Sequence, residues 1–149
     1  MNKKIAVIST GNGGQAIAAF IALKGYYVSL YAREKERVDM FANNLFHIKG
    51  IINDVASIGL ISCDMEEVIK DAYLILVTTP AQYHFAVAKE MALYLKTGQV
   101  VVLNPGRTFG TYEFNQVLEQ NGCNADILLG EADTLVFTCR CDKPGNPHI

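Results

Sequence analysis

A glycine-rich turn stands between a short apolar run and an alanine-rich segment near the start of the chain (IAVISTGNGGQA, residues 5–16). Lys4 to Ile8 is apolar and rich in β-branched residues, which predicts a buried strand of a parallel sheet. Gln15 to Lys24 is rich in alanine and stops before Gly25, which is typical of a helix that ends at a glycine. A strand, a tight turn and a helix in this order begin a βαβ unit, so this segment restricts the fold more than any other.

The same alternation continues along the rest of the chain. Further strands are expected at residues 26–31, 73–77, 99–103, 127–129 and 135–138. Further helices are expected at residues 33–46, 64–70, 81–95 and 112–121. Short strands and turns are expected over residues 47–62. Right-handed crossovers between such elements predict an α/β fold of the Rossmann type. It is one domain over residues 1–149, with a doubly wound, mainly parallel sheet covered by helices on both faces. For residues 141–149 (CDKPGNPHI), a linker to a further segment and a frayed tail both remain open.

The composition excludes several classes of protein. The chain has 13 basic and 15 acidic residues and a net charge of −2, whereas binding to nucleic acid requires clustered positive charge. Residues 5–8 are shorter than the about 7–15 apolar residues of a secretory core, and no segment approaches the about 20 residues that span a bilayer. The four cysteines, which show no CxxC spacing, are Cys63, Cys123, Cys139 and Cys141. We therefore expect reduced thiols in a cytoplasmic protein, without a metal site and without a nucleic-acid or membrane partner.

The glycine turn has the outline of the GxGxxG motif, in which glycines permit a tight bend and let the backbone approach a pyrophosphate. Gly11 and Gly14 hold the second and third glycine positions, Ser9 holds the first, and Asn12 and Gly13 lie between them. A serine at the first position restricts the backbone but keeps the amide donors and the helix N-terminus. This context favours a dinucleotide-binding turn over a purely structural bend.

The end of the second predicted strand bears on the choice of cofactor. An NAD site usually has an acidic residue about 20 residues after the glycines, where it binds the 2′-hydroxyl of the adenosine ribose. Here the position is Ala32-Arg33, and Arg33 could bind a 2′-phosphate with help from Lys35 or Arg37. The alternative is the solvated face of a charged helix. Arg33 favours NADP over NAD.

Polar residues also follow the strand predicted at 73–77. The hydroxyls of Thr78 and Thr79 and the backbone amides after Pro80 are expected to face the ribose or phosphate of a cofactor. His84 is a candidate proton donor for catalysis, although a histidine in an early helical turn is more commonly just partly exposed.

The strand predicted at 99–103 is followed by a second group of candidates. Asn104, Pro105 and Gly106 are expected near the nicotinamide, and Arg107 could attract a substrate carboxylate. A solvent-facing Pro-Gly turn is the alternative. Glu131 and Arg140 fall near later strand ends and could face the same cleft, or could be surface and salt-bridge residues.

Four segments together carry a family resemblance: AVISTGNGGQAIAAFIALKG (6–25), LVTTPAQYH (76–84), VVLNPG (101–106) and LGEADTLVFTCR (129–140). They resemble the N-terminal domain of the NAD/NADP-dependent octopine/nopaline (opine) dehydrogenases along essentially the whole chain. The NPG turn followed by GE…FTCR is the more specific part, because many dehydrogenases share the glycine turn. The arrangement is more distantly similar to ketopantoate reductase and glycerol-3-phosphate dehydrogenase.

The resemblance implies hydride transfer between NAD(P)H and an imine that an amino acid forms with an α-keto acid. It assigns the pyrophosphate to residues 11–14, and the cofactor cleft to Pro80 and residues 104–106. Ser9 and Ala32-Arg33 depart from the family pattern, and the helical domain that supplies the catalytic histidine–aspartate pair is expected to be absent. The chain alone should then bind a dinucleotide without efficient turnover. A stand-alone binding module and a ketopantoate-reductase-like oxidoreductase are the alternatives. Exposed apolar surface on an isolated half would also allow a homodimer.

Overall fold

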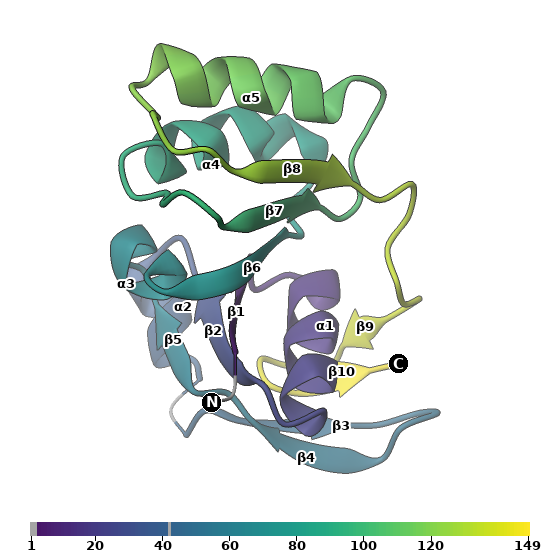
Figure 1. Cartoon of the computed structure of the whole chain (residues 1–149). Helices are drawn as coiled ribbons and strands as arrows, with labels where there is room; N and C mark the ends of the chain where they lie inside the picture. Colours follow the sequence, from purple (N-terminus) through teal and green to yellow (C-terminus); the bar gives the residue numbers. More distant parts are fainter. Residues whose placement is uncertain (1–2, 42) are drawn as a thin grey trace.

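A six-stranded sheet with the order β5-β2-β1-β6-β7-β8 runs through the computed structural model, which describes residues 3–41 and 43–149 (Figure 1). Every pairing in this sheet is parallel. Its strands are β1 (Lys4–Ile8), β2 (Tyr27–Tyr31), β5 (Leu60–Ser62), β6 (Ala72–Val77), β7 (Val100–Leu103) and β8 (Leu128–Glu131). The chain proceeds outward from β1 through β2 to β5, and in the other direction through β6 and β7 to β8. The sheet is therefore doubly wound, with its switch point between β1 and β6, and the predicted fold class is confirmed.

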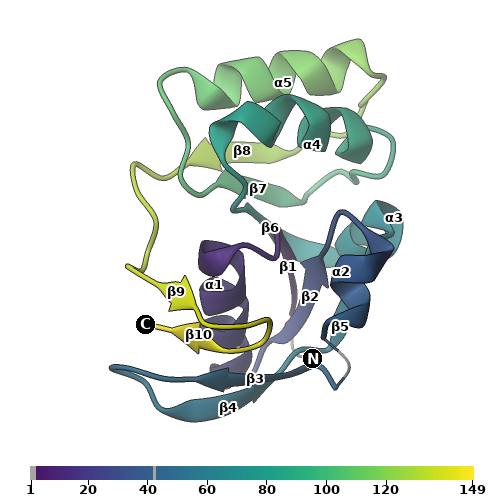
Figure 2. The same ribbon diagram turned by 180° about the vertical axis from the view of Figure 1, so that it is seen from behind.

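Helices cover both faces of the sheet (Figures 1 and 2). They are α1 (Asn12–Leu23), α2 (Lys35–Asp39), α3 (Met65–Ile69), the 3-10 turn η1 (Ala81–Tyr83), α4 (His84–Met91) and α5 (Gly110–Gln120). Alternation along β1 separates two cores, because successive strand side chains point to opposite faces. Ala6 and Ile8 pack with α3, α4 and α5, whereas Ile5 and Val7 pack with α1. None of the helices in the described ranges combines the length and the apolar character that crossing a bilayer requires.

Two antiparallel hairpins lie on the α1 side of the sheet (Figure 2). One pairs β3 (Leu45–Ile48) with β4 (Asp54–Ser57), and the other pairs β9 (Arg140–Cys141) with β10 (Pro147–His148). The backbone joins the two hairpins, since Lys49 donates to the Pro147 carbonyl over 3.0 Å and Ile149 donates to the Lys49 carbonyl over 2.9 Å. Residues 141–149 therefore belong to an ordered hairpin, so the frayed-tail interpretation of this segment is wrong, and a connection to a further segment stays a prediction.

Two predicted elements differ from the structure. The helix expected at residues 33–46 is only the short α2. Asn44 has a positive φ of 52°, a conformation that asparagine tolerates, and after it the chain turns into β3. (Residue 42 of the predicted helix lies outside the described ranges.) The strand expected at residues 135–138 is not a strand, because this segment leaves the sheet and crosses α1, where the Phe137 and Phe20 rings pack edge to face with centroids 5.1 Å apart.

The side chain at Phe46 distinguishes the observed strand from the predicted helix. Phe46 is fully buried against Phe41, whereas its neighbour Leu45 is 39% exposed. We expect Phe46→Ala to lower the free energy of unfolding by about 3–5 kcal/mol, the usual cost of removing a buried aromatic ring. Leu45→Ala is the matched control and should cost less than about 1.5 kcal/mol. Urea denaturation measures both, and equal losses would contradict the register of β3.

Candidate functional site

The glycine turn between β1 and α1 has the geometry that the GxGxxG pattern requires. Ser9 has a φ of +129°, a conformation that favours glycine, so the position where the motif has its first glycine needs glycine-like backbone here. The Ser9 hydroxyl accepts a hydrogen bond of 3.0 Å from the Gly11 amide, which partly offsets the strain. A methyl group at Gly14 would overlap the Ser9 carbonyl oxygen, so α1 packs directly against the end of β1. Ser9 therefore adopts the backbone conformation that a glycine has at the first position of the motif.

The N-terminus of α1 faces this turn. The helix begins at Asn12, and its first turn contains no acidic residue. Helix N-termini present unpaired amides and a partial positive charge, which together favour an anion such as a phosphate group. The turn and the helix start could therefore hold an anion, in the position where a doubly wound sheet binds its ligands.

A pocket opens beside the turn, at the carboxyl ends of β1, β2 and β6. Its lining is mostly apolar and consists of Ser9, Thr10, Tyr31, Arg33, Thr79, Pro80, Tyr83, Ala86, Val87 and Glu90. The Arg33 guanidinium lies over the Tyr83 ring, 5.8 Å from its centroid. Ala32, just before it, is fully buried, and its amide donates to the Ser62 carbonyl. Of the predicted pair Ala32-Arg33, only the arginine side chain reaches the pocket.

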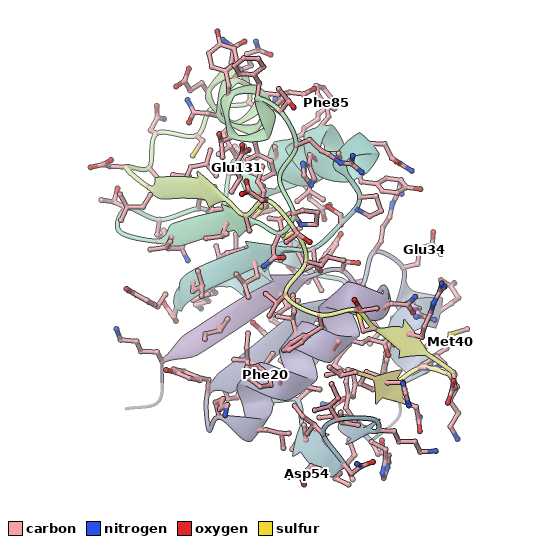
Figure 3. The ribbon with its side chains drawn as sticks, turned by 90° about the vertical axis from the view of Figure 1, so that its right-hand side faces the viewer. Phe20, Glu34, Met40, Asp54, Phe85 and Glu131 are labelled. Atoms are coloured by element: carbon pink, nitrogen blue, oxygen red, sulfur yellow. The ribbon has the colours of Figure 1, made fainter. Side chains whose placement is uncertain are left out.

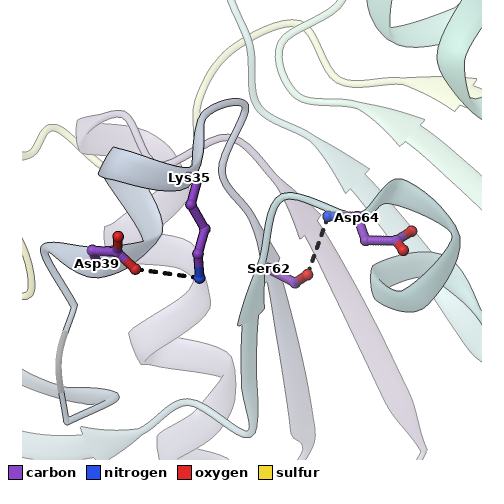
Figure 4. Close-up of polar contacts among 4 residues, drawn as sticks. All are labelled: Lys35, Asp39, Ser62 and Asp64. Carbon is purple, nitrogen blue, oxygen red and sulfur yellow. Dashed lines mark hydrogen bonds and ion pairs between the residues drawn. The ribbon is translucent and has the colours of Figure 1, made fainter.

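The other two basic residues near this pocket already have partners. Arg37 donates to the Thr10 hydroxyl over 3.2 Å and to the Thr10 carbonyl over 3.0 Å, so it supports the glycine turn. Lys35 pairs with Asp39 one turn along α2, with 3.3 Å between nitrogen and oxygen (Figure 4). Arg33 is therefore the basic side chain best placed for a ligand in the pocket.

The ends of β6 and β7 carry two buried polar atoms without a hydrogen-bond partner. These are the Thr79 hydroxyl oxygen and the Asn104 side-chain oxygen. Thr78, in contrast, donates its hydroxyl proton to the Ile8 carbonyl over 3.1 Å. Buried polar groups are normally paired, so two unpaired acceptors at the carboxyl edge of the sheet suit a ligand that brings donors.

A second depression follows the end of β7. It is lined by Gly106, Arg107, Thr108, Glu131, Ala132 and Asp133. Glu131 lies at the carboxyl end of β8, near the loop that leads into α5 (Figure 3), and accepts a hydrogen bond of 3.0 Å from the Thr111 amide. A Cβ at Gly106 would overlap the Glu131 side chain, so only glycine fits after Pro105. The structure brings Arg107 and Glu131 together, whereas Arg140 lies in β9, in the hairpin on the α1 side.

His84 is a buried residue at the start of α4. It is 3% exposed, and its Nε2 lies 3.1 Å from the Thr79 carbonyl oxygen, which can only accept, so Nε2 carries the hydrogen. Burial lowers the pKa of His84, against the smaller raising effects of the Thr79 hydrogen bond and of Glu113 and Glu131. A neutral, buried imidazole that donates to the Thr79 carbonyl is suited to holding the backbone at Thr79 in place.

The sequence interpretation missed Gln15. This side chain is 1% exposed; its nitrogen donates to the Thr10 carbonyl over 2.8 Å and its oxygen accepts from the Gly145 amide over 2.8 Å. Asn12 makes a parallel contact, accepting from the Cys141 amide over 3.1 Å. The glycine turn is thus fastened to the hairpin of β9 and β10. A glutamine in an otherwise apolar, alanine-rich helix could have indicated a buried side chain with hydrogen-bond partners.

Comparison with known proteins agrees with this geometry. A family model described as NAD-dependent glycerol-3-phosphate dehydrogenase N-terminus matches residues 4–121. Opine dehydrogenase from Arthrobacter sp. (strain 1C) is 35% identical over 151 residues, which cover 99% of this chain and 42% of that protein. The predicted resemblance to the opine dehydrogenases is confirmed.

Solved structures share the fold. Octopine dehydrogenase with NADH and pyruvate has a TM-score of 0.89 at 18% identity, over 99% of this chain and 40% of that one. Yersinopine dehydrogenase with bound NADP⁺ has a TM-score of 0.79 at 13% identity, over 99% of this chain and 38% of that one. The chain thus spans about two fifths of the length of these relatives. Relatives with this fold bind NADH or NADP⁺.

The backbone at Ser9 can be tested by two substitutions. Ser9→Ala keeps the strained φ and loses the acceptor for the Gly11 amide, so we expect a loss of about 1 kcal/mol in the free energy of unfolding. Ser9→Gly also loses the acceptor but relieves the strain, and should be more stable than Ser9→Ala by about 1 kcal/mol or more. Chemical denaturation ranks the three proteins. Equal stability of the two variants would show that position 9 does not need a positive φ.

His84 predicts a pH dependence of stability. Its pKa is lowered in the folded chain from an ordinary value of 6.5, so the unfolded chain binds the proton more readily. The stabilising contribution is complete above the unfolded pKa and is lost as the pH falls towards the folded pKa. We expect the free energy of unfolding to decline between about pH 8 and about pH 5, and to decline less in His84→Gln, whose amide can still donate to Thr79. Denaturation curves of wild type and His84→Gln across this pH range measure the decline. The same dependence of the free energy of unfolding on pH in both proteins would contradict the prediction.

Proposed function

The chain belongs to the family of NAD-dependent glycerol-3-phosphate dehydrogenase N-terminal domains, and on this basis we propose that it binds NADP, and less tightly NAD, across the carboxyl ends of β1, β2, β6 and β7. The observation that carries the proposal is the glycine turn at the switch point of the sheet, with α1 packed against Ser9 and its N-terminus open to a phosphate. The pyrophosphate would contact the backbone of residues 11–14.

The adenosine half of the dinucleotide fits the pocket between β2 and α4. In this fold the residue at the end of the second strand reads the ribose 2′ position, and Arg33 stands just beyond that end. A guanidinium suits a 2′-phosphate because it forms charge-assisted, bidentate hydrogen bonds. The Arg33 side chain therefore supports NADP as the favoured cofactor.

The nicotinamide half fits the ends of β6 and β7. There the Thr79 hydroxyl and the Asn104 side-chain oxygen are buried acceptors without a partner, and ribose hydroxyls and a carboxamide are donors. The bound cofactor supplies hydride chemistry. The residues of this chain orient the cofactor: His84 holds the Thr79 carbonyl in place, and Gly106 leaves room beside Glu131.

For the whole protein we propose the opine dehydrogenase reaction, in which NAD(P)H reduces the imine of an amino acid and an α-keto acid. The similarity to opine dehydrogenase over 99% of this chain supports it, and the bound pyruvate of octopine dehydrogenase supports the α-keto acid. Arg107 and Glu131 are the candidates on this chain for substrate contact at the second depression. The catalytic groups would belong to the part of the longer relatives that this chain does not span.

Arg33→Ala tests the cofactor preference. Wild type should bind NADPH more tightly than NADH, and the variant should lose about tenfold or more in NADPH affinity with little change for NADH, because only NADPH offers a 2′-phosphate. Calorimetric or fluorescence titration measures the four dissociation constants. Lys35→Ala is the matched control, since Lys35 is paired with Asp39, and it should bind both cofactors as wild type does.

Two outcomes would count against the proposal. If neither cofactor binds at millimolar concentration, the turn is a structural bend. If Arg33→Ala weakens NADPH and NADH equally, Arg33 does not read the 2′ position, and the preference for NADP fails while dinucleotide binding stands.

A further inference from the structure

We infer that Glu90 reads the base of the dinucleotide by accepting a hydrogen bond from the exocyclic amino group of adenine, with Tyr31 as the residue that positions its carboxylate. The inference rests on the proposed function, because it assumes that the adenosine half occupies the pocket between β2 and α4. It adds a specificity determinant on α4, in the pocket that Glu90 shares with Arg33 and with the start of the glycine turn.

The pocket has the shape and the polarity of a base site. Pro80, Tyr83, Ala86 and Val87 give it apolar walls, and flat aromatic bases pack well against such surfaces. Glu90 lies one helical turn after Ala86 and Val87, and all three line the pocket from α4. The carboxylate is therefore the polar end of an otherwise apolar wall.

Tyr31 fixes the position of this carboxylate. Tyr31 is 6% exposed at the end of β2, and its hydroxyl donates to Oε1 of Glu90 over 2.7 Å. Burial, followed by the hydrogen bond to Glu90, raises the pKa of Tyr31, so the phenol remains a donor at neutral pH. A carboxylate has two oxygens and no proton to give, so an acceptor remains for a ligand after the tyrosine is bound.

The carboxylate of Glu90 and the group at the six position of the purine together determine which base is accepted. Adenine carries an amino group at its six position, which donates, whereas hypoxanthine carries a carbonyl oxygen there, which accepts. An ionised carboxylate can pair with the first and repels the second. Arg33, the other charged side chain of the pocket lining, can only donate, so it cannot replace Glu90 in this role.

The test compares adenine dinucleotides with their hypoxanthine counterparts. The dissociation constants of NADPH, NADH and the deamino form of each are measured by fluorescence titration. Wild type should prefer the adenine forms by about tenfold, the value of one charge-assisted hydrogen bond. Glu90→Gln should reduce the preference to near unity, because an amide can accept from the amino group and donate to the carbonyl. Tyr31→Phe should give an intermediate preference, since the carboxylate is kept but no longer held.

Glu119→Gln is the control for removal of one acidic charge. Glu119 is on α5 and accepts from Asn115, so this variant should keep the wild-type preference. If wild type binds adenine and hypoxanthine forms equally, or if Glu90→Gln weakens both to the same extent, the assignment of Glu90 is overturned while the proposed function stands. If none of the four dinucleotides binds, the proposed function fails, and the assignment fails with it.

Discussion

The close approach of α1 to the end of β1 is the constraint on which the rest of the site depends. At Gly14 there is no space for a side chain, because the Ser9 carbonyl oxygen occupies the place of a Cβ. This approach brings the helix N-terminus to the carboxyl edge of the sheet and brings Gln15 beneath the Thr10 carbonyl. The same carbonyl also accepts from Arg37, so two donors from different elements hold the backbone next to the strained Ser9. Hydrogen bonds from Gln15 and Arg37 thus stabilise a turn that must be rigid to present its amides.

The carboxyl edge of the sheet divides into two chemically distinct ends. On the β2 side, an apolar pocket ends in one cation and one anion, Arg33 and Glu90, which suits a base and its ribose. On the β7 side, Asn104 has a buried side-chain oxygen without a partner, and Gly106 leaves no room for a side chain beside Glu131, which suits a reacting end that needs close approach. The glycine turn lies between them, where the pyrophosphate of the proposed dinucleotide would join its two halves. The chain corresponds to the N-terminal, NAD(P)-binding part of opine dehydrogenase-like proteins.

Local patterns were sufficient to locate the strands of the sheet and the turn, because apolar runs and glycine spacing are properties of adjacent residues. Apolar β-branched runs predicted β1, β6 and β7, and the glycine spacing identified the turn even with Ser9 at its first position. The predicted elements were wrong where contacts between residues distant in sequence determine the secondary structure. Val38, Phe41 and Leu45 are spaced as on one side of a helix, yet the burial of Phe46 in the core beside α1 places the end of this segment in a strand. Phe137 has strand-like neighbours, yet its contact with Phe20 draws the segment away from the sheet. Arg37, Gln15 and Glu90 have roles set by partners far along the chain, which no local pattern displays.

The hydrogen bond between Gln15 and Gly145 joins residues 130 positions apart. During synthesis the glycine turn is made before Gly145, so the bond that completes its support cannot form until residue 145 has been added. The six strands of the sheet are all present by residue 131, so pairing of the sheet can precede completion of the turn. Closing so long a loop is entropically costly and is repaid only when the rest of the domain is already in place. The turn that joins β1 to α1 is consequently among the last parts of this domain to reach its final form.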